Sequence, residues 1–220
     1  MCSSDLQDSL AEIAAYVRDC QIQFPVLKDA GNALADKLGA VRTPEVFVLD
    51  KDRVVRYWGR IDDRMGVGYI RDKKTHDYLK DALDQLLAGK SVETASVESV
   101  GCFIGRVKKS ASSSEVTFSN QISRILQERC VECHRPGEIG PFALTEYSEV
   151  VGWADTIAEV VRDRRMPPWH ADPQYGKFHN DRSLPEAEKK QILDWVAAGA
   201  PEGDRSQLPK LKEFVQGWSL

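Results

Sequence analysis

The segment "TPEVFVLDKDRVVRYWGR" at residues 43–60 decides the fold of the N-terminal half of the chain. Two runs rich in β-branched and aromatic residues, 46–49 and 54–58, flank the turn-forming Asp50-Lys51-Asp52. Two such runs joined by a short polar turn predict an antiparallel β-hairpin.

Helices and one further strand are expected around this hairpin. Apolar spacing predicts a helix over residues 10–17, "FPVLKD" predicts a buried strand at 24–29, and "NALADKLG" predicts a helix at 32–39. "THDYLKDALDQLLAGK" at 75–90 predicts a helix with Thr75 as N-cap and Gly89 just beyond its end. Between hairpin and helix, Asp62-Asp63 indicates an acidic turn without an acid–base role.

The stretch from "FPVLKD" to "YWGRIDD" resembles the thioredoxin-like redoxins related to alkyl hydroperoxide reductases and thiol-specific antioxidants, over about residues 5–90. The resemblance implies that Pro44 is the cis-proline preceding the strand that faces the redox centre. It also places the catalytic cysteine of the family before Asp5, so the chain is expected to begin within a domain and to lack redoxin catalysis. Cys2 has no preceding strand, and Cys20 and Cys102 are expected to be small, half-buried apolar residues.

The boundary between two domains is expected near residues 110–116. Residues 89–116 lose periodicity and end in the linker-like "KKSASSSEV". We therefore expect a thioredoxin-like domain at 1–108, a linker at 109–116, a helical domain at 117–205 and a tail at 206–220.

The pentapeptide "CVECH" at residues 130–134 is the strongest chemical signal in the sequence. C-x-x-C-H is the attachment motif of c-type haem: two thiols form thioethers with the vinyl groups, and the adjacent histidine binds the iron. A zinc site would need Cys130 and Cys133 with two of His134, His170 and His179, which lack compact spacing. A redox dithiol would begin a helix after a strand, whereas this pair ends the helix predicted over 118–129.

The sequence downstream supplies the other parts of a small haem domain. Helices are expected over 145–165 and 183–199, the second opened by a Ser183–Glu186 capping box, with the loop "MPPWHADP" between them. "CVECHRPGEIGPF", "RRMPPWHADP" and "ILDWVAAGAPEGD" resemble a bacterial mono-haem cytochrome c domain of the kind fused to redoxin and copper monooxygenase-like modules. The resemblance implies one covalently bound haem c.

In this resemblance, Cys130 and Cys133 carry the thioethers, His134 is the proximal iron ligand and Met166 is the distal one. Pro167-Pro168 stiffens the chain after Met166, which suits a weak thioether ligand. His170 is the alternative sixth ligand, and the more polar surroundings of His179 make it the third choice. The tail "LKEFVQGWSL" resembles a lead-in to the copper module, so the C-terminus also looks cut.

Composition and hydropathy exclude some classes of function. A formal charge of −4 over 220 residues disfavours nucleic-acid binding, and the sequence has neither a signal peptide nor an apolar run of the roughly 20 residues needed for a membrane span. Covalent haem implies a periplasmic or otherwise exported protein. The prediction is an α+β chain that transfers single electrons to redox partner proteins or a fused copper-binding module; the alternatives are a thiol-dependent peroxidase or oxidoreductase with accessory haem, and a haem sensor.

Overall fold

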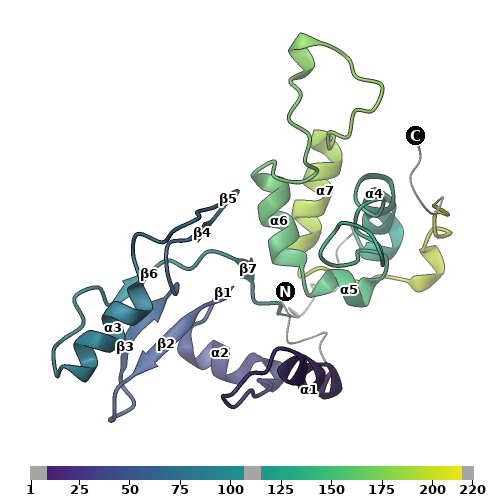
Figure 1. Cartoon of the computed structure of the whole chain (residues 1–220). Helices are drawn as coiled ribbons and strands as arrows, with labels where there is room; N and C mark the ends of the chain where they lie inside the picture. Colours follow the sequence, from purple (N-terminus) through teal and green to yellow (C-terminus); the bar gives the residue numbers. More distant parts are fainter. Residues whose placement is uncertain (1–8, 107–114, 215–220) are drawn as a thin grey trace. The chain divides into compact units, whose positions relative to one another are not determined.

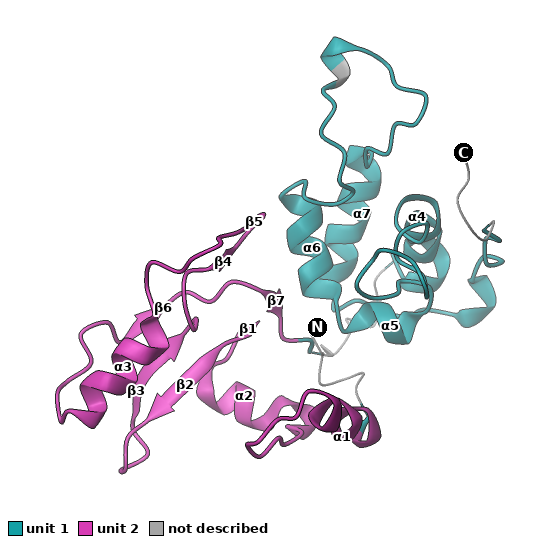
Figure 2. Cartoon of the chain, in the orientation of Figure 1, with its two compact units in different colours: residues 1, 6–9, 105–220 teal, residues 2–5, 10–104 magenta. Residues whose placement is uncertain are grey.

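The structure, a computed structural model, describes residues 9–106 and 115–214 (Figure 1). The chain divides into two compact units, which we call the N-terminal unit (residues 10–104) and the C-terminal unit (residues 105–106 and 115–214, with residue 9) (Figure 2). The mixed α and β fold class is confirmed. Most of the predicted linker, residues 109–114, lies outside the described residues.

The N-terminal unit is built on a three-stranded sheet in the order β2-β3-β6. The hairpin is confirmed: β2 (Val46–Leu49) pairs antiparallel with β3 (Val55–Gly59), and β6 (Ser96–Val97) pairs parallel with β3. The Asp50 carboxylate shapes the hairpin turn by accepting the backbone N–H groups of Asp52 and Val54 at 2.9 and 3.0 Å. Two ribbons complete the strands, β1 (Arg42–Thr43) with β7 (Cys102–Phe103) and β4 (Met65–Gly66) with β5 (Tyr69–Ile70).

Three α-helices accompany these strands: α1 (Leu10–Asp19), α2 (Ala33–Leu38), which follows the 3-10 turn η1 (Ala30–Asn32), and α3 (Tyr78–Leu87). Helix α3 packs on the hairpin, where Ala82 and Tyr57 are almost completely buried. Gly39 ends α2 with a φ of 73°, a conformation that glycine adopts without strain.

Some local expectations for this unit are wrong. Residues 24–29 form no strand; Phe24 and Leu27 are exposed, and no strand among the described residues pairs with this segment. An isolated strand leaves its backbone groups unpaired, so an apolar run without a neighbouring strand is not sufficient to form a strand. Asp77, not Thr75, precedes α3, because the Thr75 hydroxyl and N–H donate to the carboxylate of Asp63 instead.

The C-terminal unit is helical. Its elements are the π-helical turn η2 (Phe118–Ile122), α4 (Ser123–Arg129), α5 (Tyr147–Val151), α6 (Ala154–Arg162), the 3-10 turn η3 (Pro173–Tyr175), α7 (Glu186–Ala197) and the 3-10 turn η4 (Arg205–Gln207). Helices α6 and α7 lie side by side, and the connection between them, residues 163–185, extends beyond their ends (Figure 1). We call this connection the α6–α7 segment.

The core of the C-terminal unit follows the predicted periodicity. Ile122, Ile125 and Leu126 are all buried on one face of the η2–α4 segment. A reciprocal pair of hydrogen bonds between Thr117 and Asn120 caps the start of this segment, with Asn120 Oδ1 accepting the Thr117 N–H at 2.8 Å. Trp195 of α7 is fully buried and donates its indole N–H to the carbonyl of Pro201 at 2.9 Å.

Two helical expectations in this unit need correction. The helix predicted over 145–165 is two helices, α5 and α6, and the chain breaks between them at Gly152-Trp153. Gly105 packs against this break, where a Cβ on Gly105 would lie 2.5 Å from the Gly152 carbonyl oxygen. Glycine also weakens a helix intrinsically. The predicted Ser183–Glu186 capping box is absent, since Pro185 occupies the N-cap of α7 and makes no side-chain cap.

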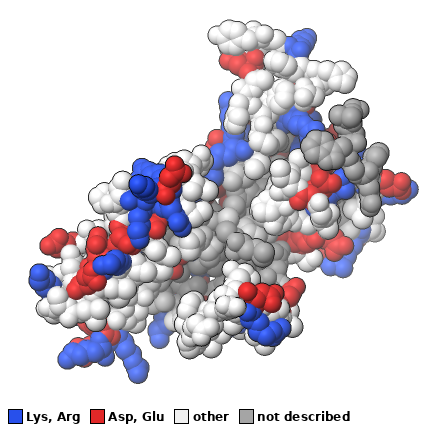
Figure 3. Space-filling model, viewed as in Figure 1, with Lys and Arg blue, Asp and Glu red and all other residues white. Residues whose placement is uncertain are grey.

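The visible surface carries both signs of charge in close alternation on each unit (Figure 3). The presence of both signs on the face in view agrees with the small formal charge of −4. Within the described residues, none of the helices has the length and apolarity required to cross a bilayer.

Candidate functional site

The C-x-x-C-H motif forms a compact turn directly after α4. The N–H groups of Cys130 and Val131 both donate to the Leu126 carbonyl, at 2.8 and 2.9 Å, and Val131 is buried. Cys133 and His134 then donate their N–H groups to the Cys130 carbonyl at 3.1 and 2.9 Å. The periodic apolar face of α4 therefore places both thiols and the imidazole within one turn.

The His134 ring is oriented by the chain that follows it. Nδ1 lies 3.1 Å from the carbonyl oxygen of Phe142. A carbonyl oxygen only accepts, so Nδ1 carries the proton of the neutral ring and Nε2 keeps a free lone pair. An imidazole whose Nδ1–H is held by a carbonyl is the usual arrangement of a histidine metal ligand.

Backbone contacts hold the loop after the motif against it. Gly140 donates its N–H to the Cys133 carbonyl at 2.8 Å, and Leu144 donates to the His134 carbonyl at 2.9 Å. A Cβ on Gly140 would lie 2.5 Å from that Cys133 oxygen and 2.8 Å from His134 Nδ1. Only glycine allows this close approach, so the residue type at 140 is part of the site.

Aromatic rings extend the site behind the histidine. The Phe142 ring lies 5.0 Å from the His134 ring and stacks on Trp153 with 4.1 Å between centroids. Trp153 is buried, yet its Nε1–H finds no hydrogen-bond partner within the described residues. The site thus contains a buried donor that an acceptor on a bound group would satisfy.

The two cysteines of the motif are free thiols. Burial, with a smaller contribution from the nearby Glu188 carboxylate, raises the pKa of the Cys130 thiol to about 12. A thioredoxin-type nucleophile needs the opposite shift, because the thiolate is the reacting species. These surroundings disfavour a redox dithiol.

The zinc alternative gains no support from the geometry. In residues 9–106 and 115–214, no three His, Cys, Asp or Glu side chains converge on a point suited to a metal ion. His170 and His179 are both exposed in the α6–α7 segment. The structure does not bring them to the cysteines.

Met166 lies at the start of the α6–α7 segment. Its N–H donates to the Val160 carbonyl at 3.1 Å, and its side chain is 40% exposed. Trp169 and Phe178 of the same segment meet edge to face, with ring centroids 5.6 Å apart. Pairing of Met166 with His134 on one iron stays a prediction.

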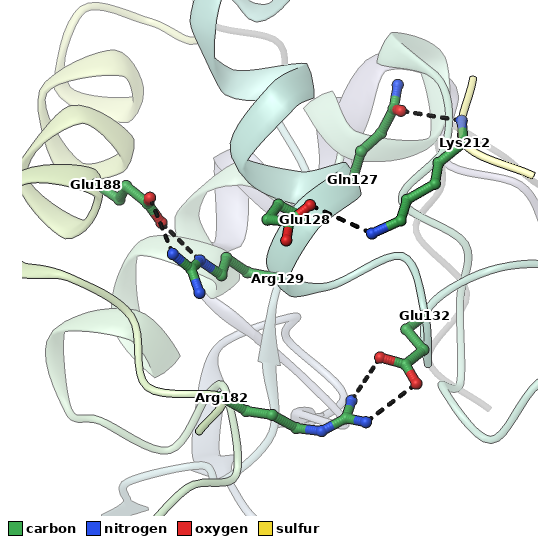
Figure 4. Close-up of polar contacts among 7 residues, drawn as sticks. All are labelled: Gln127, Glu128, Arg129, Glu132, Arg182, Glu188 and Lys212. Carbon is green, nitrogen blue, oxygen red and sulfur yellow. Dashed lines mark hydrogen bonds and ion pairs between the residues drawn. The ribbon is translucent and has the colours of Figure 1, made fainter. Parts of the chain in front are cut away.

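Among the described residues, three ion pairs join the vicinity of the motif to distant parts of the chain, and no sequence pattern pointed to them (Figure 4). Arg129, the last residue of α4, pairs with Glu188 of α7 at 2.9 Å. Glu132, inside the motif, pairs with Arg182 at 2.8 Å, and Glu128 pairs with Lys212 at 3.2 Å. The partners are 59, 50 and 84 positions apart along the chain, so only the fold could identify them.

In the N-terminal unit, the Thr43–Pro44 peptide bond is cis and β2 starts two residues later. Thr43 is paired with Cys102 across the β1–β7 ribbon. Cys102 is half-buried as expected, whereas the expectation of a half-buried Cys20 is wrong: this residue follows the end of α1, a helix with no buried residues, and is exposed. Cys2 lies outside the described residues.

A comparison with protein families matches one part of the chain. Residues 3–58 match the family model described as AhpC/TSA family. These residues are similar to redoxins. This match confirms the predicted resemblance at the level of the family, over these residues.

Two solved structures are similar to the chain. A hypothetical protein of Sinorhizobium meliloti 1021 is 37% identical over 44% of this chain and 52% of its own, with a TM-score of 0.39. An uncharacterized conserved protein of Geobacillus kaustophilus is 28% identical over 48% of this chain and 54% of its own, with a TM-score of 0.40. The chain spans about half the length of these proteins. No curated protein matches it.

Proposed function

We propose that the C-terminal unit binds one haem c covalently and transfers single electrons. The observation that carries this proposal is the contact between His134 Nδ1 and the Phe142 carbonyl at 3.1 Å, within a C-x-x-C-H turn. It leaves Nε2 of the motif histidine as the nitrogen available to an iron ion.

Each residue of the site has a distinct role in this proposal. Cys130 and Cys133 would hold the haem through thioethers, and His134 would bind its iron. Met166 would be the second iron ligand, with His170 as the alternative. A haem whose iron is bound by two side chains would supply a one-electron couple without a site for substrate, which favours electron transfer over catalysis at the iron.

One buried donor beside the motif supports the fit of a group that carries acceptors. Trp153 Nε1 is buried and lacks a hydrogen-bond partner among the described residues, and its ring stacks on Phe142, which lies against the His134 ring. Haem propionates are acceptors of the kind that such a donor requires.

The proposal extends to compartment and partners. Bacterial c-type haem is attached on the outer side of the inner membrane, so we place the protein in the periplasm or another exported location. The electron is exchanged with redox partner proteins or with a fused copper-binding module. The redoxin-like N-terminal unit is joined to the haem unit in the same chain.

The direct test is expression of the full chain with cytochrome c maturation machinery. Acid–acetone extraction should leave the haem on the polypeptide in the wild type, and replacing both Cys130 and Cys133 by Ala should release it. Cys20→Ala with Cys102→Ala is the matched control and should retain the haem. Bound zinc without haem in a matured sample would refute the proposal.

The distal ligand is tested on the same material. Oxidised protein should show the weak near-infrared band of sulfur-to-iron charge transfer, and Met166→Ala should abolish it and lower the reduction potential. If the band is missing in the wild type, the assignment moves to His170, and His170→Ala is the next variant.

A second candidate function, a thiol-dependent peroxidase, has one observation in its favour, the family match over residues 3–58. The described cysteines of the N-terminal unit, Cys20 and Cys102, would be the thiols to examine. Peroxide consumption that disappears with Cys20→Ala or Cys102→Ala would establish it, and consumption below the buffer rate would exclude it for this chain.

A further inference from the structure

The two residues between the motif cysteines have opposite environments. Val131 is 4% exposed and belongs to the core, whereas Glu132 points outward. The Glu132 carboxylate accepts two hydrogen bonds from the guanidinium of Arg182, at 2.8 and 3.0 Å (Figure 4). Arg182 is 50 residues further along the chain, near the end of the α6–α7 segment.

The pair places this arginine beside the motif, because Glu132 directly precedes Cys133 in the chain. The hydrogen bond to Glu132 is also the main reason that the pKa of Arg182 is raised. Asn180, Asp181 and Arg182 also form one wall of a cleft of about 220 Å³, whose other residues are Glu128, Arg129, Glu132 and Lys212.

Other ion pairs of the unit do not join the α6–α7 segment to the motif. Arg129 also meets Glu188 through two hydrogen bonds, at 2.9 and 3.3 Å, but that pair joins α4 to α7. Arg164 and Glu186 join the two ends of the α6–α7 segment at 3.1 Å, but both side chains are more than 70% exposed and neither belongs to the motif. A guanidinium that meets a carboxylate through two parallel hydrogen bonds fixes direction as well as distance. Among these pairs, Arg182–Glu132 can orient the segment relative to the motif.

We propose that Arg182 is a positioning residue of the haem site: its two-point pair with Glu132 holds residues 180–183 across the C-x-x-C-H turn and limits the access of water to it. The part that concerns haem rests on the proposed function; the contact between segment and turn does not.

Two consequences follow from physical chemistry. The Arg182 and Glu132 side chains are 47% and 55% exposed, so salt screens the pair and weakens the contact between residues 180–183 and the C-x-x-C-H turn. Water near a bound haem favours its more highly charged, oxidised state. Loss of the pair should therefore lower the reduction potential, and added salt should lower it more in the wild type than in a variant without the pair.

Hydrogen exchange on the haem-free full chain tests the contact itself. Arg182→Gln and Glu132→Gln should each speed exchange of the amides at 180–184 by about threefold to fivefold, the scale expected for a good surface ion pair. The charge swap Glu132→Arg with Arg182→Glu should restore most of the protection. Arg164→Gln is the matched control, at the other end of the same segment, and should leave these amides unchanged.

Potentiometry of the haem-loaded protein tests the functional part. Arg182→Gln should lower the potential, Arg182→Lys should fall between it and the wild type, and the charge swap should recover the wild-type value. Wild-type exchange rates in both single variants would overturn the proposal. A reduction potential that depends only on the charge of the side chain at position 182, whatever the amide exchange rates, would also overturn it, because the charge of Arg182 and not its positioning role would then set the potential. A chain that carries no covalent haem would refute the proposed function while the exchange result still stands by itself.

Discussion

The close approach of Gly140 to the motif makes Gly140→Ala the most informative single substitution. The new Cβ would meet the Cys133 carbonyl oxygen at 2.5 Å and His134 Nδ1 at 2.8 Å, where an ordinary contact begins near 3.4 Å. Both obstacles are held: the oxygen accepts the Gly140 N–H, and the ring nitrogen donates to the Phe142 carbonyl.

The expected cost follows from these contacts. Forcing a methyl group into a packed site costs about 1–3 kcal/mol, and a backbone obstacle places Gly140→Ala in the upper part of that range. The shift must also lengthen or break the bond between His134 Nδ1 and the carbonyl. We therefore expect lower stability in denaturant, loss of the fixed Nδ1–H tautomer, and a several-fold lower yield of covalent haem.

Gly137→Ala separates the collision from simple backbone strain. Gly137 has a φ of +85°, and no atom lies within 4 Å of the position that a methyl group would take, so alanine there costs about 1–2 kcal/mol through the backbone alone. The readouts are urea unfolding followed by tryptophan fluorescence, imidazole nitrogen NMR of His134, and haem content. If Gly140→Ala keeps the His134 tautomer and the haem yield of Gly137→Ala, the role assigned to the close approach is wrong.

Three further outcomes are expected. Phe142→Ala removes the ring stacked on Trp153 and should destabilise the C-terminal unit by about 2–3 kcal/mol in urea unfolding, whereas Phe142→Leu should cost less. At pH 8 the Cys130 thiol of folded, haem-free protein should react with iodoacetamide on the order of a hundredfold to a thousandfold more slowly than an unperturbed thiol, as read by peptide mass spectrometry; rapid labelling would contradict its burial. Hydrogen bonds from Thr75 hold the pKa of Asp63 well below its usual range, so its contribution to stability is present at neutral pH and is lost as the pH falls below about 4; Asp63→Asn should flatten that part of the stability curve.

The sequence predicted those features that depend on local pattern. The hairpin at 43–60 and the buried face of the η2–α4 segment follow from residues that are neighbours along the chain, and the C-x-x-C-H turn is itself local. The strands β1 and β4 to β7 were missed because each has two residues, too few to show an alternation. The segment 24–29 shows the reverse case, an apolar run that forms no strand without a neighbour to pair with.

The contacts that shape the candidate site depend on the path of the chain. The acceptor for His134 is a backbone carbonyl at Phe142, and every residue type carries one, so no residue letter marks it. Arg182 is one of many arginines, and its pairing with Glu132 requires the α6–α7 segment to return across the motif. The closeness of Gly140 and Phe142 in the sequence is a local signal that could have pointed to a tight packing of this loop against the motif.

The chemistry proposed for the motif also agrees with the charge environment of its first cysteine. Cys130 follows the last turn of α4, where the unpaired carbonyl groups of a helix end disfavour a negative charge, and burial and Glu188 act in the same direction. A redox dithiol would require an accessible thiolate at this position, whereas a thioether is neutral and is not opposed by these surroundings. A zinc ion would bring its own positive charge to a coordinating thiolate, so the surroundings of Cys130 do not separate zinc from haem. His134 suits either metal, since its carbonyl partner places the proton of a neutral ring on Nδ1 and leaves Nε2 free. The ligand set separates the two: within the described residues, no three His, Cys, Asp or Glu side chains converge as a zinc site would need, whereas covalent haem needs only the two thiols and the histidine of the motif.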